Sequence, residues 1–365
     1  MEKREVFGLL AKQFKTPQEV VTEIINLQAI LNLPKGTEHF LSDLHGESET
    51  FLHILRNASG VIRTKIDLAF GSDLSEGEKN DLAALIYYPE RVLKKYETAE
   101  DKKERYAEIL IRLIEVTKLV AAKYTRSKVR KALPKDYQYI IDELINMPHH
   151  SIDKKDYYNH IISSIIELGN AENFICEMCR LIQRLAIDHL HIVGDIFDRG
   201  NGADRILDSL SAYHSFDIEW GNHDVLWMGA HFGNEACVCN IIRINCAYRN
   251  LSVIERGYGI NLRPLVTFAL EEYATDDCSS FAISDVFGGE SDFEKNSLLA
   301  KMTKAITVIQ LKIENALIRR HREFFMDDRI LYPSSELTAK ERALIDLLVG
   351  EFKNNARLDD HVNLL

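Results

Sequence analysis

Three short stretches of the sequence carry side chains that can bind a metal ion or a phosphate group. The first, LSDLHGESETF at residues 41–51, places Asp43 and His45 one residue apart, directly after an apolar run. Residues i and i+2 of a β-strand point to the same side, so a strand end of this kind directs a carboxylate and an imidazole at one point. This spacing is typical of a pair of metal ligands.

The other two stretches are GDIFDRG at residues 194–200 and GNHD at residues 221–224. Taken singly, each of the three has an ordinary interpretation: a turn with a buried histidine, a turn with a local Asp–Arg pair, or a loop with a left-handed asparagine. All three follow predicted strands, however, and ligands of open α/β sheets bind beyond the carboxyl ends of the strands. Their combination therefore favours one shared metal site.

The candidate ligands are Asp43, His45, Asp195 and Asn222. Carboxylate, imidazole and amide oxygen donors suit Mn, Fe or Zn better than calcium. If Asp195 bridges, the site holds two metals. Two divalent cations opposed by few carboxylates attract a phosphate dianion and acidify water for attack on it. The expected chemistry is phosphoester hydrolysis.

Three further side chains have roles in this chemistry. Arg199 offers a planar, permanently charged fork for phosphate oxygens. His223, next to Asn222, can protonate the leaving oxygen or stabilise its charge. Asp198 can hold the imidazole of His223 cationic and oriented.

The elements that must position these residues alternate between strands and helices. Strands are predicted at residues 38–42, 188–195 and 216–224, the first of them buried, and each begins a β-loop-α unit. Residues 17–31 form an N-terminal helix that starts after Thr16. From about residue 60 to residue 185 the pattern is helical throughout. One α/β sheet interrupted by a long helical insertion explains this order.

The predicted organisation has three parts. A discontinuous core comprises residues 1–59 and 186–275, a helical insertion covers residues 60–185, and a helical extension covers residues 276–365. In the extension, apolar or small residues from Leu299 to Ala316 recur every three or four positions, which predicts a seam against another helix. Thr338 and Glu341 have the spacing of a capping box.

Composition limits the partners. The chain of 365 residues has 45 basic and 56 acidic residues, a net charge of −11, and no basic run suited to nucleic acid. It lacks a signal segment and a membrane span, which predicts a cytoplasmic protein. The six cysteines are expected to be reduced and mostly buried, and a zinc knuckle at Cys176 and Cys179 is disfavoured because their segment has helical periodicity.

The blocks SDLHG, GDIFDRG and GNHD resemble the signature motifs of the calcineurin-like metallophosphoesterases. With the long helical insertion between the first two blocks, the sequence is similar more narrowly to the class III fructose-1,6-bisphosphatases, manganese-dependent bacterial enzymes of gluconeogenesis. The resemblance implies an α/β (α+β) fold, with a β-sandwich flanked by helices that is incomplete in this chain.

The resemblance also implies a distribution of ligands. Asp43, His45 and Asp195 would bind one metal and Asp195 and Asn222 the second, with Mn²⁺ the expected ion and Fe or Zn the alternatives. Superfamily members complete the second metal with two later histidines in glycine-containing blocks, which this chain lacks. After His223 it offers only three histidines, each interpreted as a surface or packing residue: His231, His321 and His361. The resemblance therefore implies the amino-terminal part of a longer enzyme.

The expected reaction is hydrolysis of fructose 1,6-bisphosphate to fructose 6-phosphate and phosphate, with His223 as acid, Asp198 as its partner and Arg199 binding the substrate. Two alternatives remain: a protein or nucleotide phosphatase of the same superfamily, and a catalytically silent fragment or regulatory subunit. The expected partner is a sugar bisphosphate, with no nucleic acid and no membrane, and a homo-oligomer is left open. Histidines of the helical insertion, His149, His150 and His160, are predicted not to bind metal.

Overall fold

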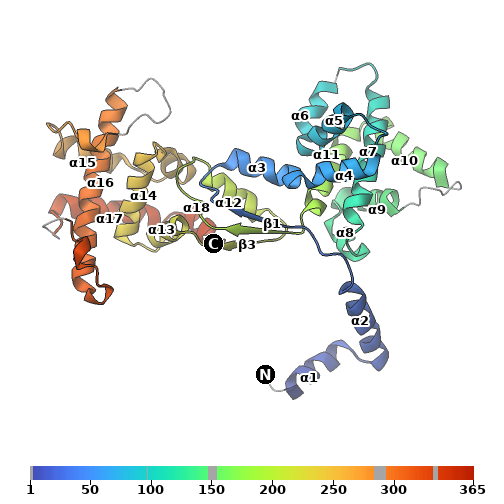
Figure 1. Cartoon of the computed structure of the whole chain (residues 1–365), viewed down its shortest axis with the longest axis horizontal. Helices are drawn as coiled ribbons and strands as arrows, with labels where there is room; N and C mark the ends of the chain where they lie inside the picture. Colours follow the sequence, from blue (N-terminus) through green and yellow to red (C-terminus); the bar gives the residue numbers. More distant parts are fainter. Residues whose placement is uncertain (1–2, 97, 147–153, 283–292, 332–335) are drawn as a thin grey trace. The chain divides into compact units, whose positions relative to one another are not determined.

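The computed structural model describes residues 3–96, 98–146, 154–282, 293–331 and 336–365 (Figure 1). The chain divides into two compact units. Unit 1 consists of Met1–Glu38 and Ile54–His189, and unit 2 consists of His39–His53 and Leu190–Leu365. The helical segment predicted at residues 60–185 falls within unit 1, whereas the predicted separation of a core from a C-terminal extension at residue 275 stays a prediction.

Unit 1 is built of helices, which confirms the helical interpretation of residues 60–185. Its helices share one continuous hydrophobic core. They are α1 (Lys3–Gln13), α2 (Pro17–Ile30), α4 (Val61–Phe70), α5 (Glu76–Tyr87), α6 (Pro89–Leu93), α7 (Lys102–Ala121), α8 (Arg126–Ala132), α9 (Gln138–Asn146), α10 (Lys155–Glu167) and α11 (Ala171–Ala186), of which α1 and α2 contribute nothing to that core.

Helices α7 and α11 form the centre of unit 1. On α11, Phe174, Met178 and Leu181 follow one another at steps of four and three and are all buried, which is the spacing of a single helix face. This face packs against α7. The two cysteines of α11, Cys176 and Cys179, are free thiols within this helix.

Helix α2 begins as its sequence predicts. The Thr16 side chain accepts a hydrogen bond from the Glu19 backbone N–H at 3.2 Å, and Pro17 occupies the first turn. A proline is well placed there because the first helical N–H groups have no partner within the helix. The apolar residues of α2 are not buried, however.

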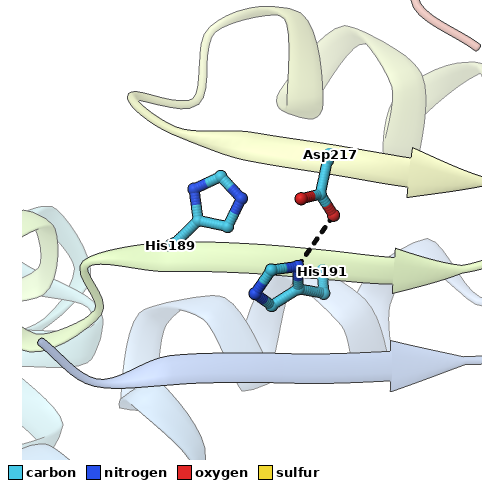
Figure 2. Close-up of side chains that lie close together, drawn as sticks. All are labelled: His189, His191 and Asp217. Carbon is cyan, nitrogen blue, oxygen red and sulfur yellow. Dashed lines mark hydrogen bonds and ion pairs between the residues drawn. The ribbon is translucent and has the colours of Figure 1, made fainter.

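The sheet has three strands, in the order β1 (Glu38–Ser42), β2 (His189–Val193) and β3 (Phe216–Glu219). Strands β2 and β3 are parallel, with Leu190 opposite Phe216 and Ile192 opposite Ile218. Figure 2 shows all three strands running in the same direction. A strand from before the helical segment thus joins two strands that follow it, which confirms the prediction of one α/β sheet.

The two faces of the sheet differ in burial. Leu190 and Ile192 of β2 are fully buried, whereas Phe40 of β1 is 66% exposed and Val193 of β2 is 50% exposed. The prediction that residues 38–42 form a buried strand is therefore wrong. Burial alternates along the strand because successive side chains point to opposite faces, and the described residues leave Phe40 and Val193 on one of these faces exposed.

A loop and a helix follow each strand, and the helices after the second and third strands lie entirely within unit 2. These helices are α3 (Ser48–Asn57), α12 (Ala203–Ser211) and α13 (Asn222–His231). The predicted third strand is too long, because the chain is already helical from Asn222 onward. Consequently His223 and Asp224 lie in the first turn of a helix and not on a strand.

The remainder of unit 2 is helical, and α16 packs against α14 and α15. On α16, Met302, Ile306 and Ile309 are buried, which confirms the predicted seam. The capping box of Thr338 and Glu341 is present at the start of α17. The described helices include none with the length and apolar character to cross a membrane. The helices are α14 (Glu235–Ala247), α15 (Arg263–Glu272), α16 (Phe293–Arg320), α17 (Ala339–Lys353) and α18 (Ala356–Val362).

Candidate metal centre

The loops that follow β1 and β2 are joined by backbone hydrogen bonds. The His45 N–H donates to the Asp195 carbonyl at 2.8 Å, and the Gly46 N–H donates to the Ile196 carbonyl at 2.8 Å. In return, the Gly200 N–H donates to the His45 carbonyl at 2.7 Å. The first two sequence motifs are thus held side by side by their own backbones.

Glycines allow the three loops to approach this closely. A Cβ atom added at Gly46, whose φ is +69°, would lie 2.4 Å from the carbonyl oxygen of Gly200. A Cβ atom at Gly221 would lie 2.0 Å from Oδ1 of Asp195. Any larger residue at these positions would push the loops apart, so the glycines of the motifs are required by packing.

Asp43, His45 and Asp195 come together as the sequence predicts. One ligand atom from each lies within 4.8 Å of the other two. The distance from His45 Nε2 to Asp43 Oδ1 is 3.6 Å. His45 is buried, Asp195 is half-buried and Asp43 is exposed, so the group is supported from within the protein and open on one side.

The imidazole of His45 is oriented for metal binding. Its Nδ1 lies 3.2 Å from the Phe197 carbonyl oxygen, and a carbonyl can only accept, so Nδ1 carries the proton. Nε2 is then left with its lone pair, as in metal-binding histidines whose other ring nitrogen donates to the backbone. The donor set and its support therefore fit a divalent metal held by these three residues.

The backbone at this centre is strained. Asp43, His45 and Asp195 have φ angles of 52°, 41° and 54°, in the left-handed region that non-glycine residues rarely adopt. Such conformations cluster at functional sites, because the surrounding structure must hold them in place. Here the hydrogen bonds between the two loops do so.

Asn222 and Arg199, the other two residues predicted to contact metal or substrate, are exposed at the edge of the group. Asn222 is the first residue of α13, next to His223, whose backbone N–H donates to Asp195 Oδ1 at 3.2 Å. Arg199 has a φ of 69° and follows Asp198 in the second loop. Their roles as metal ligand and phosphate ligand stay predictions.

His223 and Asp198 form the expected pair. His223 Nδ1 lies 2.7 Å from Asp198 Oδ2, and the Asp198 side chain is buried. The hydrogen bond to Asp198 raises the pKa of His223, although burial and the positive charge of Arg199 oppose this shift. The ring of His223 also meets the ring of His45 edge to face, with centroids 5.3 Å apart. The pair therefore stands directly beside the potential metal ligands.

Asp224 has a role that sequence reasoning missed, although it belongs to the third motif. Its fully buried carboxylate accepts hydrogen bonds from the backbone N–H groups of Asp195 at 2.7 Å, Ile196 at 2.9 Å and Gly221 at 2.9 Å. Burial raises the pKa of Asp224, while these hydrogen bonds act in the opposite direction. Asp224 thus ties the second loop to the third.

The later histidines are engaged elsewhere. His231 Nε2 pairs with Asp359 at 3.0 Å, and His321 Nδ1 pairs with Glu323 at 2.8 Å. His361 lies 3.0 Å from both Tyr258 Oη and Asp208 Oδ1. Among the described residues, none of the three belongs to a group of potential metal ligands. Their interpretation as packing or surface residues agrees with these contacts.

Of the three histidines in the helical insertion, His160 lies among the described residues. His160 lies on α10 and lines a pocket with Tyr137 and Phe174. It belongs to no group of potential metal ligands in the part of the chain that the structure describes. His149 and His150 lie outside the described residues.

Figure 2 shows a second set of ligand-type side chains on the sheet, which sequence reasoning also missed. His191 Nδ1 on β2 lies 2.8 Å from Asp217 Oδ1 on β3, and the His191 ring stacks on Phe40 with centroids 4.3 Å apart. His189 precedes His191 by two residues on the same strand. These residues lie along the strands and not at their carboxyl ends, where ligands of α/β sheets bind.

The fold and the site define a class: an α/β protein with a candidate metal centre at the carboxyl ends of parallel strands and a His–Asp pair beside it. Over residues 5–336 the chain matches the family described as Firmicute fructose-1,6-bisphosphatase. The chain belongs to this family.

Similar proteins carry the same description. A class 3 fructose-1,6-bisphosphatase of Alkaliphilus metalliredigens is 50% identical over 391 residues, which cover 98% of this chain and 58% of the relative. Proteins of the same name from Clostridium acetobutylicum and Clostridium botulinum are 48% and 47% identical with the same coverage. The chain thus spans 58% of the length of these curated relatives. No solved structure matches it.

Proposed function

We propose that this chain carries the catalytic centre of a metal-dependent phosphatase that converts fructose 1,6-bisphosphate to fructose 6-phosphate and phosphate. The observation that carries the proposal is the meeting of Asp43, His45 and Asp195 within 4.8 Å, in a chain of this family. The relatives are named for this substrate. A phosphorylated sugar of metabolism as substrate also supports a cytoplasmic location.

The metal we propose is Mn²⁺, with Fe or Zn as alternatives that the mixed donors also suit. Asp43, His45 and Asp195 would hold one ion, and Asp195 with Asn222 would contribute to a second. A divalent metal supplies Lewis-acid polarisation of the phosphoryl group and acidifies water for the attack. The protein contributes the fixed ligand positions, which the hydrogen bonds between the loops maintain.

Arg199 and His223 would act on the substrate. The guanidinium of Arg199 is permanently charged and can bind two phosphate oxygens at once. When water attacks phosphorus and the bond to the sugar oxygen breaks, His223 would give its Nε2 proton to that oxygen. The bond from Nδ1 to Asp198 supports this assignment, because it leaves Nε2 as the nitrogen that faces the substrate.

We further propose that the three-stranded sheet is one layer of a calcineurin-like sandwich. Exposed Phe40 and Val193 lie on the uncovered face of the sheet, and large exposed apolar side chains favour burial by another layer. The relatives extend well beyond the length that this chain spans, and their remaining part is the proposed source of that layer.

The test is phosphate release by metal-depleted protein after addition of Mn²⁺, Fe²⁺ or Zn²⁺. We expect release from fructose 1,6-bisphosphate with the unchanged chain and none with Asp195→Asn. Asp217→Asn is the matched control, because this carboxylate lies along the sheet and should leave activity unchanged.

Two outcomes contradict the proposal in different ways. Release from a phosphopeptide or a nucleotide but not from the sugar would favour a different phosphatase of the superfamily. Failure to bind any of the three metals would favour a catalytically silent chain.

A further inference from the structure

The carboxylate of Asp198 receives three side-chain hydrogen bonds. Its Oδ2 faces His223 Nδ1 at 2.7 Å. Its Oδ1 accepts from Trp227 Nε1 at 3.1 Å and from Asn245 Nδ2 at 2.9 Å. Among the described residues, therefore, Oδ1 accepts from two donors of the protein interior, and Oδ2 pairs with the histidine.

These donors come from two helices that pack on each other. His223 and Trp227 are four residues apart on α13, so they lie on one face of this helix. Asn245 is on α14, which packs against α13. Trp227 is itself held by stacking on Phe197, with the ring centroids 4.5 Å apart and an angle of 16° between the ring planes. Trp227 and Asn245 are both fully buried, and Asp198 is 1% exposed.

The orientation of the Asn245 amide follows from its partners. Nδ2 uses its two N–H groups on Asp198 Oδ1 and on the Ile241 carbonyl at 2.9 Å. Oδ1 of Asn245 is buried without a hydrogen-bond partner among the described residues. The reverse orientation would set this oxygen against the Asp198 carboxylate. A buried acceptor left without a partner disfavours folding, so the amide is better explained by what its N–H groups do for Asp198.

We propose that Trp227 and Asn245 are positioning residues for the reaction, acting through Asp198 on His223. This inference rests on the proposed function, in which His223 protonates the leaving oxygen. By binding Oδ1 from two directions, the two donors fix the rotation of the Asp198 carboxylate and aim Oδ2 at Nδ1. The ring thereby keeps its Nδ1 proton on Asp198 both as the cation and after proton transfer, so the proton that the cation gives up is the one on Nε2, which is held toward the substrate.

The kinetic test uses Trp227→Phe, which keeps an aromatic ring against Phe197 but removes the N–H, and Asn245→Leu, which has a similar volume. We expect each to lower kcat for fructose 1,6-bisphosphate by about 10-fold, which is a part of the roughly 10²- to 10⁴-fold that acid–base catalysis supplies. KM and Mn²⁺ affinity should not change. Asn240→Leu is the matched control, since this half-buried asparagine of α14 bonds Glu314 and not Asp198, and should leave kcat as it is.

A double-mutant cycle separates positioning from general damage to the fold. In an Asp198→Ala background, Trp227→Phe and Asn245→Leu should lower kcat no further, because the group through which they act is absent. If each lowers kcat by the same factor in both backgrounds, their effect does not pass through Asp198 and the proposal is overturned.

The tautomer of His223 gives a readout that requires no catalysis. In the metal-free chain labelled with ¹⁵N-histidine, at alkaline pH where imidazoles are neutral, His223 should carry its proton on Nδ1. Its resonances are identified by their loss in His223→Gln. Both variants should shift the ring toward a mixture of tautomers. If both variants shift the tautomer but the unchanged chain releases no phosphate, the proposed function is wrong, while the positioning of His223 by Trp227 and Asn245 is supported. An unchanged tautomer in both variants would overturn the positioning role, whatever the activity.

Discussion

The glycine at position 46 illustrates how single residues set the geometry of the candidate centre. Its φ of +69° is matched by that of Gly259 in the same unit, yet the surroundings differ. A Cβ atom at Gly46 would meet the Gly200 carbonyl oxygen at 2.4 Å, whereas one at Gly259 would meet nothing within 4 Å. Alanine at Gly259 would therefore introduce backbone strain alone, whereas alanine at Gly46 would add a steric collision.

We predict that Gly259→Ala lowers the free energy of unfolding by about 1–2 kcal/mol, the usual penalty of a left-handed alanine. Gly46→Ala should lower it by more, because the loop must also move away from Gly200. It should weaken Mn²⁺ binding as well, since His45 is the preceding residue. Urea denaturation and calorimetric titration measure the two effects. Equal losses of stability in the two variants would mean that the loops are not closely packed.

At this scale, the sequence predicts which candidate ligands lie together better than it predicts the residues that support them. Asp43, His45 and Asp195 could be found because each follows a predicted strand within a short motif, and parallel strands end at one edge of a sheet. Asn245 could not be predicted as a support, since nothing near it in the sequence shows that α14 places it beside Asp198. Trp227 leaves only a faint signal, its spacing of four residues from His223.

Among the elements, α16 and α17 are joined by a buried ion pair. Lys312 Nζ lies 2.7 Å and 2.8 Å from the two carboxylate oxygens of Glu341, and both side chains are buried. Glu341 is also the third residue of α17, where Oε2 accepts from the Thr338 backbone N–H at 2.7 Å. One carboxylate thus caps a helix and links it to its neighbour.

We predict that Lys312→Met lowers the free energy of unfolding by about 3–5 kcal/mol, because it leaves the charge of Glu341 buried without its partner. Lys304→Met is the matched control on α16, since Lys304 pairs with the more exposed Asp276. It should lower stability much less than Lys312→Met does, because water screens an ion pair at the surface. Denaturant titration followed by far-UV circular dichroism measures both. Similar losses for both lysines would show that burial adds nothing to the importance of this pair.

Helix positions could be predicted because periodicity and caps are local signals. The burial of a strand could not, because it depends on which layers cover the two faces of the sheet. The residues of β1 alternate between exposed and buried, although the sequence around Phe40 and Leu41 is apolar. The start of α13 at Asn222 could not be predicted either, since the sequence GNHD is equally typical of a loop.

In the molecule as a whole, the two proposed metal positions differ in the number of candidate protein ligands. Unit 2 brings Asp43, His45 and Asp195 together, and within the sequence motifs Asn222 is the one further candidate ligand for a second metal. His231 and His361 are buried in pairs with Asp359 and Asp208. In the described residues, therefore, the first proposed metal would have three protein ligands and the second would have two.

We accordingly predict that the chain binds one Mn²⁺ firmly and a second more weakly, by at least the 10–100-fold that loss of ligand support typically brings. Phosphate release at a given Mn²⁺ concentration should then follow occupancy of the weaker position, since both ions are needed to stabilise the attacking and the leaving oxygen. Calorimetric titration of this chain, beside the full-length relative from Alkaliphilus metalliredigens, measures the difference. His231→Gln and His361→Gln should leave both affinities of this chain unchanged. The prediction is wrong if this chain binds two Mn²⁺ ions with equal affinity and loses one of the two sites in His231→Gln or in His361→Gln. The histidine concerned would then leave its carboxylate partner and complete the second site.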